Sequence, residues 1–268
     1  MKNVSRYPFA MVPLAGERSG KPRTTGITMM MDWGLPCGRV KDNLELLAPY
    51  VDLVKIVVGT ARLYAEDYLI RKLSLYKESG VEPFLGGQFA EYVFATQGMQ
   101  AMGAFFAEAK RVGFEEVEIS DNCVSLTEPE RRALIHMAID RGLGVHGEVG
   151  SKVEKQAPEI LVAQAKVCFD AGCRVVLVEA AELVDHGTPN RELVVALRNE
   201  LDLSKVLFEL SGSWIKGTTL SDVYELKKFL ISEFGPDVNL ANVMPDDVFE
   251  TEALRNGLSV VGPDDTGS

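Results

Sequence analysis

Four short apolar runs, each ending in a glutamate, recur at nearly constant spacing through the middle of the chain. Their glutamates, Glu118, Glu148, Glu179 and Glu209, are 30, 31 and 30 residues apart. A β-branched run such as 175–178, followed by a longer amphipathic segment, is typical of a strand followed by a helix. One β-α unit occupies roughly 30 residues. The spacing therefore predicts that this part of the chain is a series of β-α units.

The same alternation extends over the rest of the sequence. It gives eight strand candidates, at 27–31, 53–58, 81–86, 116–120, 144–148, 174–179, 205–210 and 238–242. Helix candidates lie between them at 66–79, 100–112, 128–141, 158–171, 190–201, 221–234 and 245–256. Eight such units without a linker favour a (β/α)8 barrel over a doubly wound sheet. We predict one α/β domain over residues 1–268, a TIM barrel in which residues 1–24 form an N-terminal arm.

Charge and cysteine content limit the kinds of partner. The net charge of -11 and the pI near 4.9 argue against nucleic acid or an anionic membrane, which both require a basic face. The four cysteines form no Cys-x-x-Cys pair, and reduced thiols are the simplest interpretation. No apolar run approaches the ~18 residues of a membrane span. We expect a cytoplasmic homo-oligomer that binds a small anionic carboxylate, with no nucleic-acid or membrane partner.

In a (β/α)8 barrel, the side chains at the carboxyl ends of the strands converge on one site. The four repeated glutamates end consecutive strand candidates, so we expect them to face one another. Like charges raise each other's pKa, and a divalent cation would neutralise them. An all-oxygen ligand set without histidine or cysteine favours Mg²⁺ or Mn²⁺ over zinc. Asp32, after the first strand, is a fifth candidate ligand.

Further polar residues and glycines follow the same strand ends. Lys55 lies inside an apolar strand, where lysine is rarely buried unless it is paired, and it is a candidate catalytic residue. His146 shares a strand face with Glu148, although a single histidine in a barrel is more often a hydrogen-bonded core residue. Candidates for substrate binding are Arg62, Gly59, Thr60, Gly86, Gly87, Asp121, His146 and Asn242. A glutamate at a strand end is also often structural, and the repetition is what favours a site.

Several ordered motifs resemble one known family. They are Lys21-Pro22-Arg23, Asp32-x-Gly34-Leu35, Asp52-Leu53-Val54-Lys55, Gly59-Thr60-x-Arg62-Leu63-Tyr64, Glu118-Ile119-Ser120-Asp121, Glu148-Val149-Gly150-x-Lys152 and Asn239-Leu240-Ala241-Asn242. Between about residues 21 and 258 the chain resembles the phosphosulfolactate synthase family. The resemblance implies a (β/α)8 barrel and Mg²⁺-dependent addition of sulfite to phosphoenolpyruvate, on a route towards coenzyme M. It also implies that Lys152 is the catalytic acid or base at the substrate α-carbon.

The chain departs from the family pattern after five of its strand candidates. Gly59-Thr60-Ala61 stands where the family has Gly-Thr-Ser, and Gly86-Gly87-Gln88 where it has Gly-Gly-Thr. Glu179-Ala180-Ala181-Glu182 replaces Glu-Gly-Arg-Glu, residues 209–213 replace Glu-Ala-Pro-x-Lys, and residues 257–262 replace Gly-Leu-Arg-Gly-Asp-Thr. The last of these loops is where a barrel commonly binds phosphate. The departures remove cations and leave the acidic residues in place.

Three functions are compatible with these observations. The first is a divergent lyase that adds or eliminates a nucleophile, with sulfite as one candidate, at an enol or α,β-unsaturated carboxylate through a metal-stabilised enolate. The second is phosphosulfolactate synthesis itself, with Lys216 or Arg255 replacing the lost cations. The third is a non-catalytic barrel with a stress or interaction role. The acidic residues and Lys152 favour the two enzymes.

Overall fold

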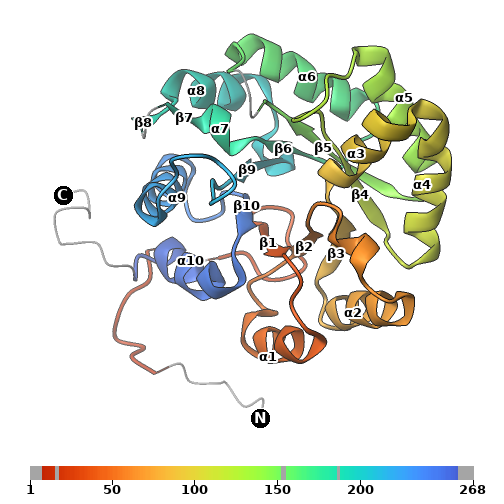
Figure 1. The fold of residues 1–268 in the computed structure, drawn as a ribbon. Helices are drawn as coiled ribbons and strands as arrows, with labels where there is room; N and C mark the ends of the chain where they lie inside the picture. The colour runs from red at the N-terminus through yellow and green to blue at the C-terminus, as the bar shows by residue number, and fades with distance from the viewer. Residues whose placement is uncertain (1–7, 16–17, 152–154, 186–187, 259–268) are drawn as a thin grey trace.

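A computed structural model describes residues 8–15, 18–151, 155–185 and 188–258. Eight parallel strands close into a barrel, with helices around its outside (Figure 1). The strands are β1 (Thr28–Asp32), β2 (Leu53–Ile56), β3 (Glu82–Leu85), β4 (Glu116–Ile119), β5 (Gly144–Val149), β6 (Val175–Val178), β9 (Val206–Glu209) and β10 (Leu240–Val243). They pair in chain order, and β10 closes the barrel on β1. The predicted (β/α)8 barrel is confirmed.

Helices surround the strands, and seven of those in the described residues match the helix candidates of the sequence. The helices are α1 (Cys37–Leu47), α2 (Glu66–Glu78), α3 (Gly87–Gln97), α4 (Met99–Arg111), α5 (Glu128–Ile139), α6 (Pro158–Asp170), α7 (Ala180–Leu183), α8 (Arg191–Glu200), α9 (Leu220–Phe234) and α10 (Val248–Arg255). Short 3₁₀ turns, η1 (Thr60–Leu63), η2 (Leu203–Lys205) and η3 (Pro245–Asp247), join some of them. The capping box of Thr127 and Glu130 starts α5.

Helices α1, α3 and α7 have no counterpart among the helix candidates of the sequence. Helix α3 is separated from α4 only by Gly98, which has a φ of 77°. A two-stranded hairpin of β7 (Val184–Asp185) and β8 (Thr188–Pro189) follows α7. No helix in the described ranges is long and apolar enough to cross a membrane.

The side chains of each strand point alternately into and out of the barrel, and the inward ones form layers. Every second residue points inward, and six inward side chains form a buried apolar layer across the barrel: Met29, Leu53, Phe84, Leu177, Leu207 and Ala241. The outward residues pack against the helices in a much larger cluster. Because the inward positions recur every second residue, residues two before and two after this layer also face the interior. Lys55 and Glu209 are two residues beyond Leu53 and Leu207, at the carboxyl ends of β2 and β9.

Candidate active site

A pocket of about 260 Å³ lies at the carboxyl ends of the strands. Its lining comes from every barrel strand, or the loop after it, except β6: Met31, Trp33, Lys55, Val57, Val58, Gly86, Gly87, Gln88, Glu118, Cys123, Glu148, Glu209, Trp214 and Asn242. This is the end at which TIM barrels carry their active sites. We call it the carboxyl-end pocket.

Three of the four repeated glutamates meet in this pocket. One carboxylate oxygen from each of Glu118, Glu148 and Glu209 lies within 4.8 Å of the other two, and all three residues are buried. The Nζ of Lys55 is 2.8 Å from Glu118 Oε2 and 2.9 Å from Glu209 Oε1. Asn122 Nδ2 donates a hydrogen bond of 2.5 Å to Glu148 Oε1. The sequence prediction that these glutamates converge is correct for three of them, and Lys55 is paired.

Burial and mutual contact change the proton affinities of this group. Burial alone would lower the pKa of Lys55, but the charges of Glu118, Glu209 and Glu148 outweigh it and raise that pKa. Burial raises the pKa of Glu118 well above its ordinary value; Lys55 opposes this rise, and Glu148 and Glu209 add to it. Lys55 is therefore a charged hydrogen-bond donor rather than a base.

The glycines after β3 allow Glu118 to approach the backbone. Gly87 N donates a hydrogen bond of 2.8 Å to Glu118 Oε1. A Cβ on Gly87 would lie 2.3 Å from Ser120 Oγ and 2.9 Å from Glu118 Oε1, so a larger residue would displace the carboxylate. A Cβ on Gly86 would lie 3.3 Å from Cγ of Lys55. The missing side chains of Gly86 and Gly87 therefore leave room for Lys55 and Glu118, and the binding of substrate by these glycines stays a prediction.

Two lining residues have unusual backbone conformations. Val58 has a φ of 45° and Asn242 a φ of 60°, in the left-handed region that side chains rarely adopt. A β-branched residue such as valine is especially disfavoured there, and strain of this kind clusters at functional sites. The Oδ1 of Asn242 is buried and has no hydrogen-bond partner. An uncompensated buried acceptor at a pocket wall favours a ligand or ion at that position.

The donor set of the carboxyl-end pocket fits a hard divalent cation. Three carboxylates and one charged lysine leave a formal charge of -2 for this group, which one divalent cation would balance. The oxygen-only ligands and the free Oδ1 of Asn242 match the preference of Mg²⁺ or Mn²⁺. Glu118, Glu148 and Glu209 are the residues that would hold it.

The two other predicted metal ligands lie apart from this group. Glu179 follows β6 where the chain turns into α7, and its carboxylate accepts a hydrogen bond from Ala181 N. Asp32 is fully buried behind β1, where its carboxylate contacts Lys72 Nζ at 2.6 Å and Tyr76 Oη at 2.7 Å. Its other oxygen accepts hydrogen bonds from the backbone of the following turn. Neither carboxylate belongs to the described group of three, and their role as metal ligands stays a prediction.

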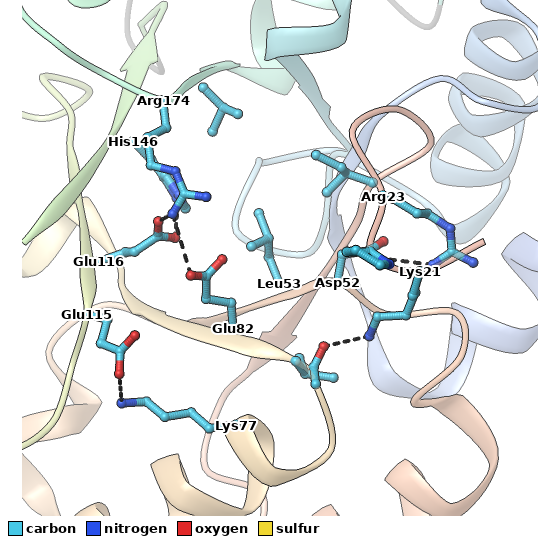
Figure 2. Close-up of a pocket in the computed structure, with 15 residues that line it drawn as sticks. Lys21, Arg23, Asp52, Leu53, Lys77, Glu82, Glu115, Glu116, His146 and Arg174 are labelled. Atoms are coloured by element: carbon cyan, nitrogen blue, oxygen red, sulfur yellow. Dashed lines mark hydrogen bonds and ion pairs between the residues drawn. The ribbon is translucent and has the colours of Figure 1, made fainter. Parts of the chain in front are cut away.

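His146 lines a second cavity, at the opposite end of the barrel (Figure 2). This cavity of about 420 Å³ is bordered by residues at the start of the strands. His146 Nε2 is 2.8 Å from Glu116 Oε2, and Arg174 contacts the same carboxylate. Burial lowers the pKa of His146 to about 4, so the imidazole is neutral. His146 shares a strand face with Glu148, but residues two apart on a strand are ~6.6 Å apart, and His146 is not among the lining residues of the carboxyl-end pocket. Its role in substrate binding stays a prediction.

The remaining predicted residues are dispersed. Gly59 and Thr60 begin η1, and Arg62 is exposed and borders a different cavity between α2, α3 and α4. Asp121 pairs with Arg131 behind β5 and does not line the carboxyl-end pocket. Lys152 lies outside the described residues.

Neither proposed replacement cation lines the pocket. Lys216 is exposed in the loop before α9, two residues after Trp214, and is not among the lining residues. Arg255 donates hydrogen bonds to the carbonyls of Pro236 and Val238, which precede β10, and so it lies at the opposite end of the barrel. Among the described lining residues, Lys55 is the only cation.

Sequence reasoning also missed several residues of the pocket. Trp33 and Trp214 border it, and their ring centroids are 5.9 Å apart. Asn122 supports Glu148, and Glu91 accepts hydrogen bonds from Ser120 and from the backbone of Cys123 beneath the loop after β4. Periodicity gives no signal for such loop residues. The rarity of tryptophan, with two in the sequence, was the one available indication.

Comparisons with known proteins agree with the motifs. Residues 16–260 match the family described as (2R)-phospho-3-sulfolactate synthase (ComA). The phosphosulfolactate synthase of Methanothermobacter thermautotrophicus is 31% identical, over 91% of this chain and 94% of that protein. The enzyme of the same name from Methanocaldococcus jannaschii is 31% identical, over 87% of this chain and 92% of its own. Protein HEAT-STRESS-ASSOCIATED 32 of Arabidopsis thaliana is 23% identical, over 89% of this chain and 88% of that protein.

A solved structure supports the fold. The carboxyl transferase domain of Rhizobium etli pyruvate carboxylase, with pyruvate and biocytin, superposes with a TM-score of 0.54 at 14% identity. The match covers 85% of this chain and 41% of that one, and at this identity it is a likeness of fold alone. The family match over nearly the whole chain goes further, and it confirms what the motifs indicated. The chain belongs to the phosphosulfolactate synthase family.

Proposed function

We propose that the protein is a divergent lyase of this family. It would add a nucleophile to an enol or α,β-unsaturated carboxylate, or eliminate one from the saturated product. Sulfite is a candidate nucleophile. In the addition, the nucleophile bonds to the β-carbon, the electrons of the double bond move towards the carboxylate, and a proton is delivered to the α-carbon. No oxidant or reductant is needed.

The observation that supports this proposal is the buried group of Glu118, Glu148 and Glu209 at the carboxyl end of the barrel. When bound there, a divalent cation supplies Lewis-acid stabilisation of the charge that develops on the substrate carboxylate. Lys55 contacts two of the three glutamates, and it would hold their carboxylates in place as a charged donor. The buried position excludes bulk water, which strengthens each of these interactions.

Two residues are candidates for the proton transfer. Lys152 is the residue that the family motif implies, and we retain it as the acid or base at the α-carbon. Glu118 is the second, since burial raises its pKa well above its ordinary value; in that role it would not also hold the cation, which Glu148 and Glu209 would then bind. Exchange of the α-hydrogen for deuterium, followed by NMR for a saturated carboxylate in D₂O with Mg²⁺, reports this step without knowledge of the nucleophile. Absence of exchange for all small carboxylates, together with absence of carbon–sulfur bond formation from sulfite, would contradict the proposal.

Phosphosulfolactate synthesis is the second candidate, and the names of the Methanothermobacter and Methanocaldococcus relatives favour it. The cation content of the described lining is the argument against it, because Lys55 already contacts two carboxylates. A stress or interaction role has support only from the name of the Arabidopsis relative. Formation of phosphosulfolactate from sulfite and phosphoenolpyruvate separates these readings directly. We retain the expectations of a cytoplasmic homo-oligomer and a small anionic carboxylate substrate as parts of this proposal.

A further inference from the structure

Trp33 and Trp214 form an aromatic wall at the rim of the carboxyl-end pocket. Trp33 follows β1, and Trp214 lies in the loop after β9, so the chain brings them together from distant segments. Their ring centroids are 5.9 Å apart, with an angle of 36° between the planes. Trp33 is 44% exposed, whereas the three glutamates of the same pocket are at most 2% exposed. The pocket therefore has a charged floor and an apolar rim.

Both indoles are held by specific local structure. Gly212 lies beneath Trp214, and a Cβ there would be 2.3 Å from atoms of its ring. This glycine allows the indole to lie flat on the backbone. Trp33 is the first residue of the turn whose backbone amides, from Gly34 and Leu35, bond to Asp32 Oδ1 at 2.8 Å. Asp32 is itself fixed by Lys72, so the turn that carries Trp33 is anchored in the barrel wall.

The charges of this pocket disfavour a phosphate at the rim. Lys55 is the single cation in the described lining, and it already contacts Glu118 and Glu209. The faces of aromatic rings carry negative electrostatic potential. A phosphate beside the indoles would lose its hydration without gaining charge-assisted hydrogen bonds. An apolar group would instead gain buried area against the two rings.

We infer that Trp33 and Trp214 form the subsite for the β-substituent of the substrate, and that this substituent is apolar. The substrate class is then a small α,β-unsaturated carboxylate with its carboxylate towards the glutamates and an alkyl or aryl group against the indoles. This inference rests on the proposed carboxylate and metal site. The cavity of about 260 Å³ restricts the whole ligand to a small molecule.

Intrinsic fluorescence tests the inference, because the sequence contains two tryptophans and both border this pocket. The probes are acrylate, trans-2-hexenoate and phosphoenolpyruvate, each titrated with Mg²⁺ present and absent, and calorimetry gives the dissociation constants. We expect trans-2-hexenoate to change the fluorescence and to bind about tenfold more tightly than acrylate, since burying roughly two methylene groups has that effect. Phosphoenolpyruvate should bind more weakly than trans-2-hexenoate.

Variants of Trp33 and Trp214 test whether their rings cause the preference for trans-2-hexenoate over acrylate. Trp214→Ala and Trp33→Ala should reduce the ratio of the two alkenoate affinities towards one and leave acrylate binding unchanged. Trp214→Phe, which retains a flat apolar ring, should keep the preference. Gly212→Ala should reduce it as Trp214→Ala does, because the added methyl group displaces the indole. Circular dichroism of each variant checks that the barrel is folded.

The outcomes separate this inference from the proposed function. Mg²⁺-dependent binding of acrylate and trans-2-hexenoate with equal affinity would overturn the apolar subsite and leave the metal site in place. A preference that survives both alanine substitutions would also overturn it, as would tighter binding of phosphoenolpyruvate. Failure of both carboxylates to bind under any condition would overturn the inference and the proposed function together.

Discussion

The Nζ of Lys55 lies 2.8 Å from Glu118 Oε2, and both side chains are buried in the barrel. Lys55→Met would remove the one cation from the described lining and leave three carboxylates together. We expect a loss of about 3–5 kcal/mol in the free energy of unfolding without metal, the scale for breaking a buried ion pair. Mg²⁺ should restore part of it. Chemical denaturation with and without Mg²⁺ measures both effects, and Lys77→Met is the control, because its exposed pair with Glu115 contributes under about 1 kcal/mol.

Divalent-cation binding should depend on three of the four repeated glutamates. Glu148→Gln and Glu209→Gln each remove a charged ligand, so we expect them to weaken Mg²⁺ or Mn²⁺ binding by more than the roughly 10–100-fold effect of altering a supporting residue. Glu179→Gln is the matched control, and it should bind the cation as the natural protein does. Isothermal titration calorimetry gives the affinities. Equal losses of cation affinity in Glu179→Gln and Glu148→Gln would instead support the prediction that all four glutamates face one another around the cation.

Phosphoenolpyruvate should bind weakly. The described lining of the carboxyl-end pocket has no cation for the phosphate beyond Lys55, which already contacts Glu118 and Glu209. Calorimetry with Mg²⁺ measures the affinity, and mass spectrometry detects any product formed with sulfite. Tight, metal-dependent binding followed by phosphosulfolactate formation would establish the family's own reaction and overturn this expectation.

Lys152 should carry the proton to or from the substrate α-carbon. Lys152→Met retains approximate bulk and removes the amine, and we expect turnover to fall by roughly 10²-fold or more, the scale of general acid–base catalysis. Folding and substrate affinity should change little. Lys155→Met is the control, since Lys155 donates a hydrogen bond to the carbonyl of Val184. Normal turnover by Lys152→Met would assign the proton transfer elsewhere, with Glu118 as the next candidate.

Gly87→Ala should disturb the site through one methyl group. Its Cβ would lie 2.9 Å from Glu118 Oε1 and 2.3 Å from Ser120 Oγ, so we expect destabilisation of about 1–3 kcal/mol, typical of overpacking. Divalent-cation binding should weaken with it. Gly38→Ala in α1 is the control, because nothing lies within 4 Å of the added atom, and alanine favours the helix by about 0.5–1 kcal/mol. Thermal unfolding and calorimetry distinguish the two substitutions.

The barrel could be predicted from the sequence because each short apolar run of a strand is followed by a helical segment with a different hydrophobic periodicity. Glu179 lies outside the group of three carboxylates, and equal spacing could not show this because it does not reveal where a strand ends. The chain turns into α7 at this residue, and the carboxylate caps that helix. The contacts of Asp32 could not be predicted, because Lys72 and Tyr76 belong to α2, more than 30 residues away. Such tertiary contacts leave no local pattern.

The position of His146 shows a different limit of sequence analysis. Two-residue periodicity identifies the face of a strand but not the depth of a side chain within the barrel. The sequence placed His146 on the same strand face as Glu148, and the structure shows its side chain beside Glu116 (Figure 2). The aromatic wall of Trp33 and Trp214 was missed because both residues lie in loops, where no periodicity applies.

The apolar layer of Met29, Leu53, Phe84, Leu177, Leu207 and Ala241 separates two polar ends that can change independently. No proton or ion passes between the two ends, since a dry hydrocarbon layer carries neither ions nor a continuous chain of hydrogen bonds. The opposite end, with Arg23 bound to Asp52 and Lys21 bound to three carbonyls, ties the N-terminal segment to the barrel. Evolution could therefore exchange one reaction for another above the layer while the part that keeps the barrel closed remained as it was.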